Sequence, residues 1–192
     1  MPEPSEQAIE AKETDRRVAL IIALLALLLA LAEAGSKQAQ HLSIETNIES
    51  SDLFNFYQAK RIRETVVETA AKTLEAQKAG APPAAVEPIQ TAIAALNATV
   101  TRLRKDPEKP EDSLDAIQER AKAAVETREL ANRRLQHYEL GSGLAQIAIV
   151  LASAAIVTGV SMLVWFSVAL GGIGAVLLAF GFLAPMILPL GG

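Results

Sequence analysis

Apolar residues are concentrated at the two ends of this 192-residue chain, and the C-terminal concentration is the longer one. From Gly141 to Gly192, 52 consecutive residues include no Asp, Glu, Lys or Arg. This tract is too long for one membrane-spanning helix, which needs about 20 residues, but it suits two helices joined by a tight turn. We therefore expect transmembrane helices over 141–162 and 164–190, with the turn near Gly159–Ser161.

The N-terminal apolar run, Val18–Ala32, follows a polar tail over 1–17 that contains five acidic and three basic residues. With its continuation to Gly35 the run approaches the length needed to cross the hydrocarbon core. A cleaved secretory signal peptide is the alternative, because Ala32-Glu33-Ala34 matches a small-x-small cleavage pattern. The long, acid-rich tail argues against cleavage, so we expect a retained transmembrane helix over 18–35.

The polar middle of the chain, 36–140, is predicted to form a helical hairpin outside the membrane. Two proline-rich breaks, Gly80–Pro83 and Asp106–Pro110, divide it into three helices. The first would be about 66 Å long, and the second and third stacked end to end about 75 Å, so we expect the first to run against the other two. A break at Ser50–Asp52, giving a shorter three-helix bundle, is the alternative.

Heptad spacing of apolar residues indicates coiled-coil-like seams in this hairpin. The seam of the second helix, about 84–105, consists of Val86, Ile89, Ile93, Leu96, Val100 and Leu103. The seam of the third helix, about 113–140 and capped by Ser113, consists of Leu114, Ile117, Ala121, Ala124, Arg128, Ala131, Leu135 and Tyr138. The first helix has a weaker stripe at Ile62, Val66, Ala70 and Leu74. Narrow, alanine-rich seams bury little apolar area, so we expect the hairpin to associate with other copies or with a partner protein.

Small residues recur at helical spacing in the membrane segments. In the first they are Ala19, Ala23, Ala26 and Ala30. In the second they are Ala145, Ala148, Ala152, Ala155 and Gly159. Small side chains let helices approach closely in lipid, so we expect these two helices to pack against each other or against copies of themselves. Gly171, Gly172 and Gly174 mark another close-approach surface on the third. An alanine-rich composition alone is the alternative explanation.

Composition narrows the class of protein further. No segment alternates apolar and polar residues as a half-buried strand does, so the chain is predicted to be an all-α membrane protein. The absence of cysteine excludes disulfides, thiol nucleophiles and thiolate metal sites. With a net charge of −4 and scattered Lys and Arg, nucleic acid is not an expected partner. No charged residue lies in the second or third transmembrane helix, which argues against a transporter.

The most distinctive candidate site combines aromatic and basic side chains on the first long helix. It consists of Phe54, Phe56, Tyr57, Lys60, Arg61 and Arg63. One interpretation is a docking surface for a partner or for anionic groups. The other, which we favour, is a packed aromatic face beside solvated charges.

No catalytic or metal-binding motif is evident in the sequence. His41 and His137, with Glu45, could hold zinc or iron only if the hairpin brought them together, and the sequence has no Glu-x-x-His pair. Phosphate loops, nucleophile elbows and paired carboxylates are also missing. We therefore expect no enzyme activity, no cofactor and no metal.

Three stretches of the chain carry a family resemblance: Val18–Gln40, the block FNFYQAKRIRET at Phe54–Thr65, and Tyr138–Thr158. Together they resemble a bacterial family of small membrane proteins catalogued only as a domain of unknown function. The resemblance implies the same three-span layout and a bacterial membrane location, but no activity, cofactor or substrate. The chain departs from that family at Gly159–Ser161, where the family tends to carry basic residues.

These features predict a non-enzymatic protein of the bacterial inner membrane that self-associates as a scaffold through its coiled-coil stalk. A subunit of a larger membrane complex and an oligomeric pore are the alternatives. The lipid bilayer is an expected partner, with further copies or another membrane protein. Basic residues before the first span, Lys12, Arg16 and Arg17, slightly favour a stalk on the periplasmic side.

Overall fold

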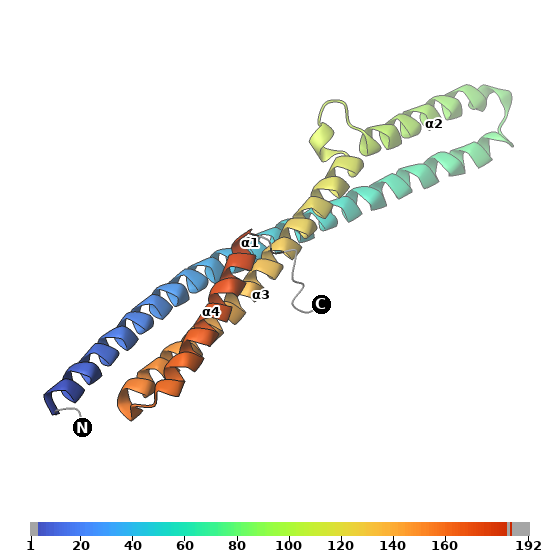
Figure 1. The fold of residues 1–192 in the computed structure, drawn as a ribbon. Coiled ribbons are helices and arrows are strands. Elements are labelled where there is room, and N and C mark those ends of the chain that lie inside the picture. Colours follow the sequence, from blue (N-terminus) through green and yellow to red (C-terminus); the bar gives the residue numbers. More distant parts are fainter. Residues whose placement is uncertain (1–3, 184, 186–192) are drawn as a thin grey trace. The chain divides into compact units, whose positions relative to one another are not determined.

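The computed structural model describes residues 4–183 and 185, and side chains from residue 16 onward. Figure 1 shows the elements in chain order: α1 (Pro4–Lys78), α2 (Pro83–Arg104), the 3-10 helix η1 (Pro110–Asp112), α3 (Leu114–Thr158) and α4 (Ser161–Leu183). Within these residues there is no strand, so the all-α prediction is confirmed. Three helices in this part of the chain are long and apolar enough to cross a membrane: α1 from Arg16, α3 and α4.

The helix ends differ in part from the predicted boundaries. The helix α1 extends back to Pro4, so residues 4–17 of the polar tail are helical. The helix α3 passes through Gly141 without a break, which makes the second predicted span the end of a longer helix. Residues 184 and 186–190 of the third predicted span lie outside the described residues.

The chain divides into two compact units. Unit 1 consists of α1 as far as Ile44, α3 from Arg128 onward, and α4. It contains the apolar parts of the three helices that could cross a membrane. Unit 2 comprises Glu45–Thr127, that is, the rest of α1, α2, η1 and the start of α3.

In unit 1, α1 and α3 bury residues at seven-residue intervals. On α1 these residues are Val18, Leu25, Ala32 and Ala39. On α3 they are Ala131, Tyr138, Ala145 and Ala152. A buried position every seven residues is typical of helices that cross at a shallow angle and interlock along their length.

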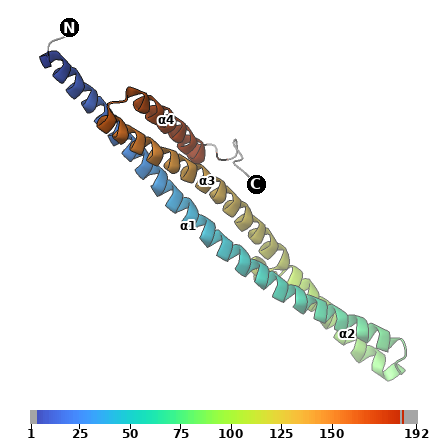
Figure 2. The same ribbon diagram turned by 90° about the horizontal axis from the view of Figure 1, so that it is seen from below.

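The helix α4 folds back beside α3, as both views show (Figures 1 and 2), and packs through residues with little or no side chain. Ser167, Gly171, Gly174 and Gly181 are its buried residues. The hydroxyl of Ser167 donates a hydrogen bond of 2.7 Å to the carbonyl of Ala148. A Cβ added at Gly174 would lie 3.0 Å from the carbonyl oxygen of Gly141, so the two backbones are almost in contact there. This close approach is the packing expected of helices in lipid, where van der Waals contact is the main attraction.

The turn between α3 and α4 lies where the sequence places it. Gly159 has φ +68°, a left-handed conformation that glycine adopts without steric cost. Its amide donates a 2.9 Å hydrogen bond to the carbonyl of Ala155, which ends α3 in an ordered way.

In unit 2 the predicted seams of α2 and α3 face inward. Leu53 of α1 forms a core cluster with Ile117 and Ala121 of α3. On α2, Ile93 and Val100 are buried and the other four seam residues are half-buried. On α3, the seam residues in unit 2, Leu114, Ile117, Ala121 and Ala124, are buried. The α3 seam continues into unit 1, where Ala131 and Tyr138 are buried and Arg128 and Leu135 are half-buried.

The helix α1 differs from two expectations. It runs without a break through residues 50–52, so the three-helix alternative is wrong. Ser50 is buried there, and its hydroxyl donates to the carbonyl of Asn47 in the same helix. The predicted stripe is also wrong as a hairpin contact, because Ile62, Val66 and Ala70 are exposed and only Leu74 is half-buried.

The connection from α2 to α3 is held by local hydrogen bonds. The carboxylate of Asp106 accepts the amides of Glu108 and Lys109, at 3.0 and 3.3 Å. These bonds, first that of Glu108, lower the pKa of Asp106 below its usual value. The hydroxyl of Ser113 accepts the amide of Ala116 at 3.4 Å, which confirms the predicted cap of α3.

Candidate functional site

The aromatic–basic patch, formed by Phe54, Phe56, Tyr57, Lys60, Arg61 and Arg63, is divided between inward-facing and outward-facing residues. Tyr57 is half-buried and packs against the Leu53 cluster. Phe54 and Phe56 are 41% and 43% exposed, and Arg63 is exposed. The patch is therefore not one continuous surface.

Two of its basic residues already have partners within unit 2. The ammonium of Lys60 donates a hydrogen bond to the carbonyl of Asp112 at the end of η1, and lies 5.1 Å from the centre of the Phe56 ring. The guanidinium of Arg61 pairs with the carboxylate of Glu64. These contacts lie within unit 2, and binding an external anion would compete with them.

Glu64 is a buried carboxylate between α1 and α2, with a side chain only 1% exposed. It accepts hydrogen bonds from Arg104 of α2 and from Arg61, and Arg104 also donates to Glu68 at 2.6 Å. Burial raises the pKa of Glu64, but the hydrogen bonds and positive charges of Arg104 and Arg61 outweigh it, so this pKa lies below its usual value. The ion pair between Glu64 and Arg104 could not be predicted from the sequence, because the two residues are 40 positions apart and each lies among other charged residues.

Opposite the buried side of α1 in unit 2 lies a row of exposed aliphatic residues, which we call the outer face. It consists of Ile48, Ile62 and Val66, which are 56%, 65% and 63% exposed. At about 100° per residue these three lie within about 40° of one another around the helix, and roughly opposite Leu53 and Glu64. A shallow groove runs beside this row, between Tyr57 and Val66. Ile62 and Val66 are one turn apart, whereas Ile48 lies about 21 Å before Ile62 with the exposed Asp52 and Asn55 between them. The pair Ile62 and Val66 is therefore the part of the outer face best suited to contact another helix.

The two alanine series of the membrane segments have different surroundings. Ala145, Ala148, Ala152 and Ala155 of α3 are buried inside unit 1. Ala19, Ala23, Ala26 and Ala30 of α1 are exposed, so they do not form the contact between α1 and α3. Packing of the α1 series against another copy stays a prediction. Gly159 lies exposed in the turn, and of the three glycines noted on α4 only Gly172 is exposed.

The two histidines lie in different surroundings. His41 is exposed, whereas His137 is buried. Among the residues whose side chains are described, no group of three His, Cys, Asp or Glu could hold a metal ion.

A family model described as a domain of unknown function (DUF4337) matches residues 14–184, which include both units. No curated protein and no solved structure matches the chain.

Proposed function

The chain belongs to the DUF4337 family, whose domain has no known function. From the residues of the chain itself, we propose that it is a non-enzymatic scaffold of the bacterial inner membrane, assembled from several copies of this chain. The outer face of α1 carries this proposal. One side of that helix is already buried within unit 2, and the opposite side presents Ile48, Ile62 and Val66 to water.

Burial of this outer face by a second copy would be favourable. Removing a side chain such as Ile62 or Val66 from water is worth about 1.5–3 kcal/mol when burial is complete. Single exposed aliphatic residues are ordinary on protein surfaces, but these three share one side of a long helix. A helix that has apolar residues on two opposite sides can pack between two neighbours, as in a multi-stranded coiled coil.

The membrane segment offers a second surface for association. Ala19, Ala23, Ala26 and Ala30 of α1 are exposed in unit 1 and are spaced three or four residues apart. Such a series would let a helix of another copy approach closely in the bilayer.

The test is the mass of the full-length protein extracted in mild detergent and measured by native mass spectrometry. We expect one homo-oligomer, and we expect the double substitution Ile62→Glu/Val66→Glu to weaken it, because two carboxylates would have to be buried in the contact. The effect on the dissociation constant should be about tenfold or more.

Thr91→Glu/Ala95→Glu is the matched control. It places two carboxylates four residues apart on the exposed side of α2, and it should leave the mass unchanged. A monomeric wild-type protein would contradict the proposal. A second protein in constant ratio with the chain would favour the alternative, a subunit of a larger complex.

A further inference from the structure

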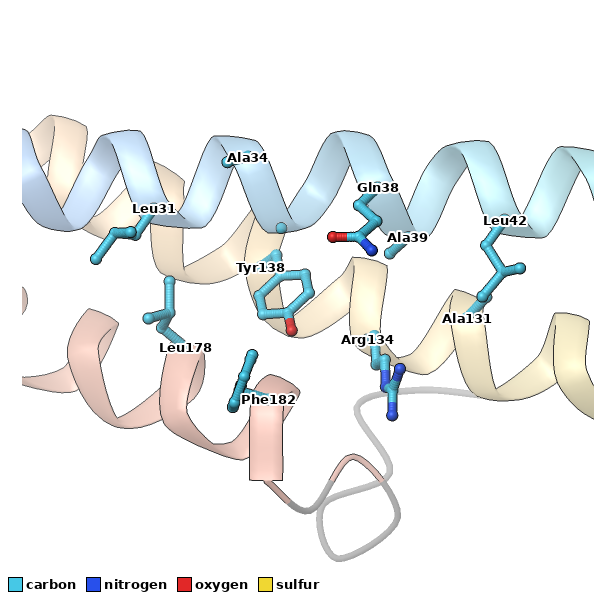
Figure 3. Close-up of a pocket in the computed structure, with 11 residues that line it drawn as sticks. Leu31, Ala34, Gln38, Ala39, Leu42, Ala131, Arg134, Tyr138, Leu178 and Phe182 are labelled. Atoms are coloured by element: carbon cyan, nitrogen blue, oxygen red, sulfur yellow. The ribbon is translucent and has the colours of Figure 1, made fainter.

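We propose that unit 1 binds the phosphate group of an anionic phospholipid in a groove between its three helices. The groove has a volume of about 580 Å³ and is open to the surroundings. It is lined from α1 by residues that include Leu31 and Gln38, from α3 by residues that include Arg134 and Tyr138, and from α4 by Leu178 and Phe182. Figure 3 shows an apolar end formed by Leu31, Leu178 and Phe182, and next to it a polar part.

The polar part of the groove contains one buried hydrogen-bond donor that lacks an acceptor within the described part of the chain. This donor is the Nε of Arg134, which is buried without a hydrogen-bond partner among the described residues. The side chains of Gln38 and Tyr138 line the same groove (Figure 3). A buried donor without an acceptor is costly, and phosphate oxygens suit a guanidinium because they accept two parallel hydrogen bonds.

Arg134 is the main source of the site's preference for an anion. Its sequence neighbour Arg133 and the residue beside Gln38, Lys37, add positive charge, but Glu33 and Glu139 lie beside the lining residues Ala34 and Tyr138 and offset it. Since these exposed or half-exposed charges nearly balance, discrimination between lipids has to come from direct contact with Arg134.

The apolar end indicates that the anion is carried by a lipid and is not a soluble phosphate. Leu31 is 55% exposed and Phe182 is 75% exposed, and both belong to helices apolar enough to cross a membrane. Arg134 lies two turns before Gly141, where the charge-free tract begins. An acyl chain could therefore lie along Leu31, Leu178 and Phe182 while its phosphate reaches Arg134 at the headgroup level.

The experiment measures lipid binding to the full-length protein in detergent by native mass spectrometry. The probes are dioleoyl phosphatidylglycerol, dioleoyl phosphatidylcholine and inorganic phosphate. We expect phosphatidylglycerol to bind more tightly than phosphatidylcholine, and inorganic phosphate not to displace it. Arg134→Gln should weaken phosphatidylglycerol binding about tenfold, because it removes the charge-assisted hydrogen bonds.

Arg120→Gln is the matched control, because it removes the same charge from an exposed position of the same helix that does not line the groove. It should leave the preference for phosphatidylglycerol intact. If Arg134→Gln fails to fold, Arg134→Lys keeps the charge but loses the planar fork, and we expect an intermediate affinity.

Three results would overturn the proposal. They are equal binding of the two lipids to the wild-type protein, unchanged binding of phosphatidylglycerol to Arg134→Gln or Arg134→Lys, and displacement of the lipid by inorganic phosphate. None of them depends on whether the chain self-associates, so this site and the scaffold role are tested separately.

Discussion

Replacement of Gly174 by leucine is expected to separate α4 from α3 and to destabilise unit 1. A Cβ at this position would lie 3.0 Å from the carbonyl oxygen of Gly141 and 3.6 Å from the Cβ of Leu144. The nearest obstacle is backbone, so it cannot move aside as a flexible side chain can. Added methylene groups in a packed interior cost about 1–3 kcal/mol, and leucine adds several atoms beyond Cβ.

Gly172→Leu provides a control on the same helix, because a Cβ at Gly172 would meet no atom within 4 Å. It makes the same change in hydrophobicity, and it replaces a poor helix former with a good one. Both variants are heated in detergent, and size-exclusion chromatography then measures the fraction of protein that remains monodisperse. We expect a lower midpoint temperature for Gly174→Leu only. Equal midpoints for the two variants would mean that α3 and α4 are not in close contact at Gly174.

Substitution of Glu64 by glutamine is expected to weaken unit 2 by about 1–3 kcal/mol, the usual cost of leaving strong hydrogen-bonding groups poorly satisfied. The change removes the negative charge shared by Arg61 and Arg104 but keeps the shape of the side chain. Glu68→Gln is the control, because Glu68 contacts the same Arg104 from a side chain that is 34% exposed. Thermal unfolding of the full chain, followed by circular dichroism, should show a clearly larger loss for Glu64→Gln.

The pH dependence of that difference is a second signature of Glu64. Because its pKa is lower in the folded state than the usual 4.5, its ionised form stabilises the fold. This contribution is complete above the unfolded-state pKa and is lost as the pH falls through the lower, folded-state pKa. The stability gap between wild type and Glu64→Gln should therefore be largest near neutral pH and shrink in acid. A gap that does not change with pH would show that the charge of Glu64 contributes nothing.

The sequence pattern was sufficient to predict the elements of unit 2 and most of its seams. Proline-rich segments ended α1 and α2 near the expected positions, and Ser113 capped α3. The heptads of α2 and α3 could be predicted from the sequence because large aliphatic residues such as Ile93 and Ile117 occupy buried positions. In these helices hydrophobicity and burial coincide.

On α1 hydrophobicity and burial coincide at Val18, Leu25 and Leu53 but not farther along the helix, and the predicted stripe failed there for that reason. Its buried positions include Ala39, Thr46 and Glu64, whereas Ile62 and Val66 point outward. Small or paired polar side chains can be buried where helices approach closely, but they leave no apolar stripe in the sequence. Gly174 and Gly181 of α4 are a similar case, since their role depends on the backbone they face.

The central claim, that the outer face of α1 contacts another copy, can be tested most directly by cysteine cross-linking in native membranes. The chain has no cysteine, so Ile62→Cys introduces a single thiol on this face. Thr91→Cys, at an exposed position of α2, serves as the control. After treatment with a short bifunctional maleimide, we predict covalent dimers of this chain for Ile62→Cys and only monomers for Thr91→Cys. Cross-linking of Ile62→Cys no greater than that of Thr91→Cys would contradict the account.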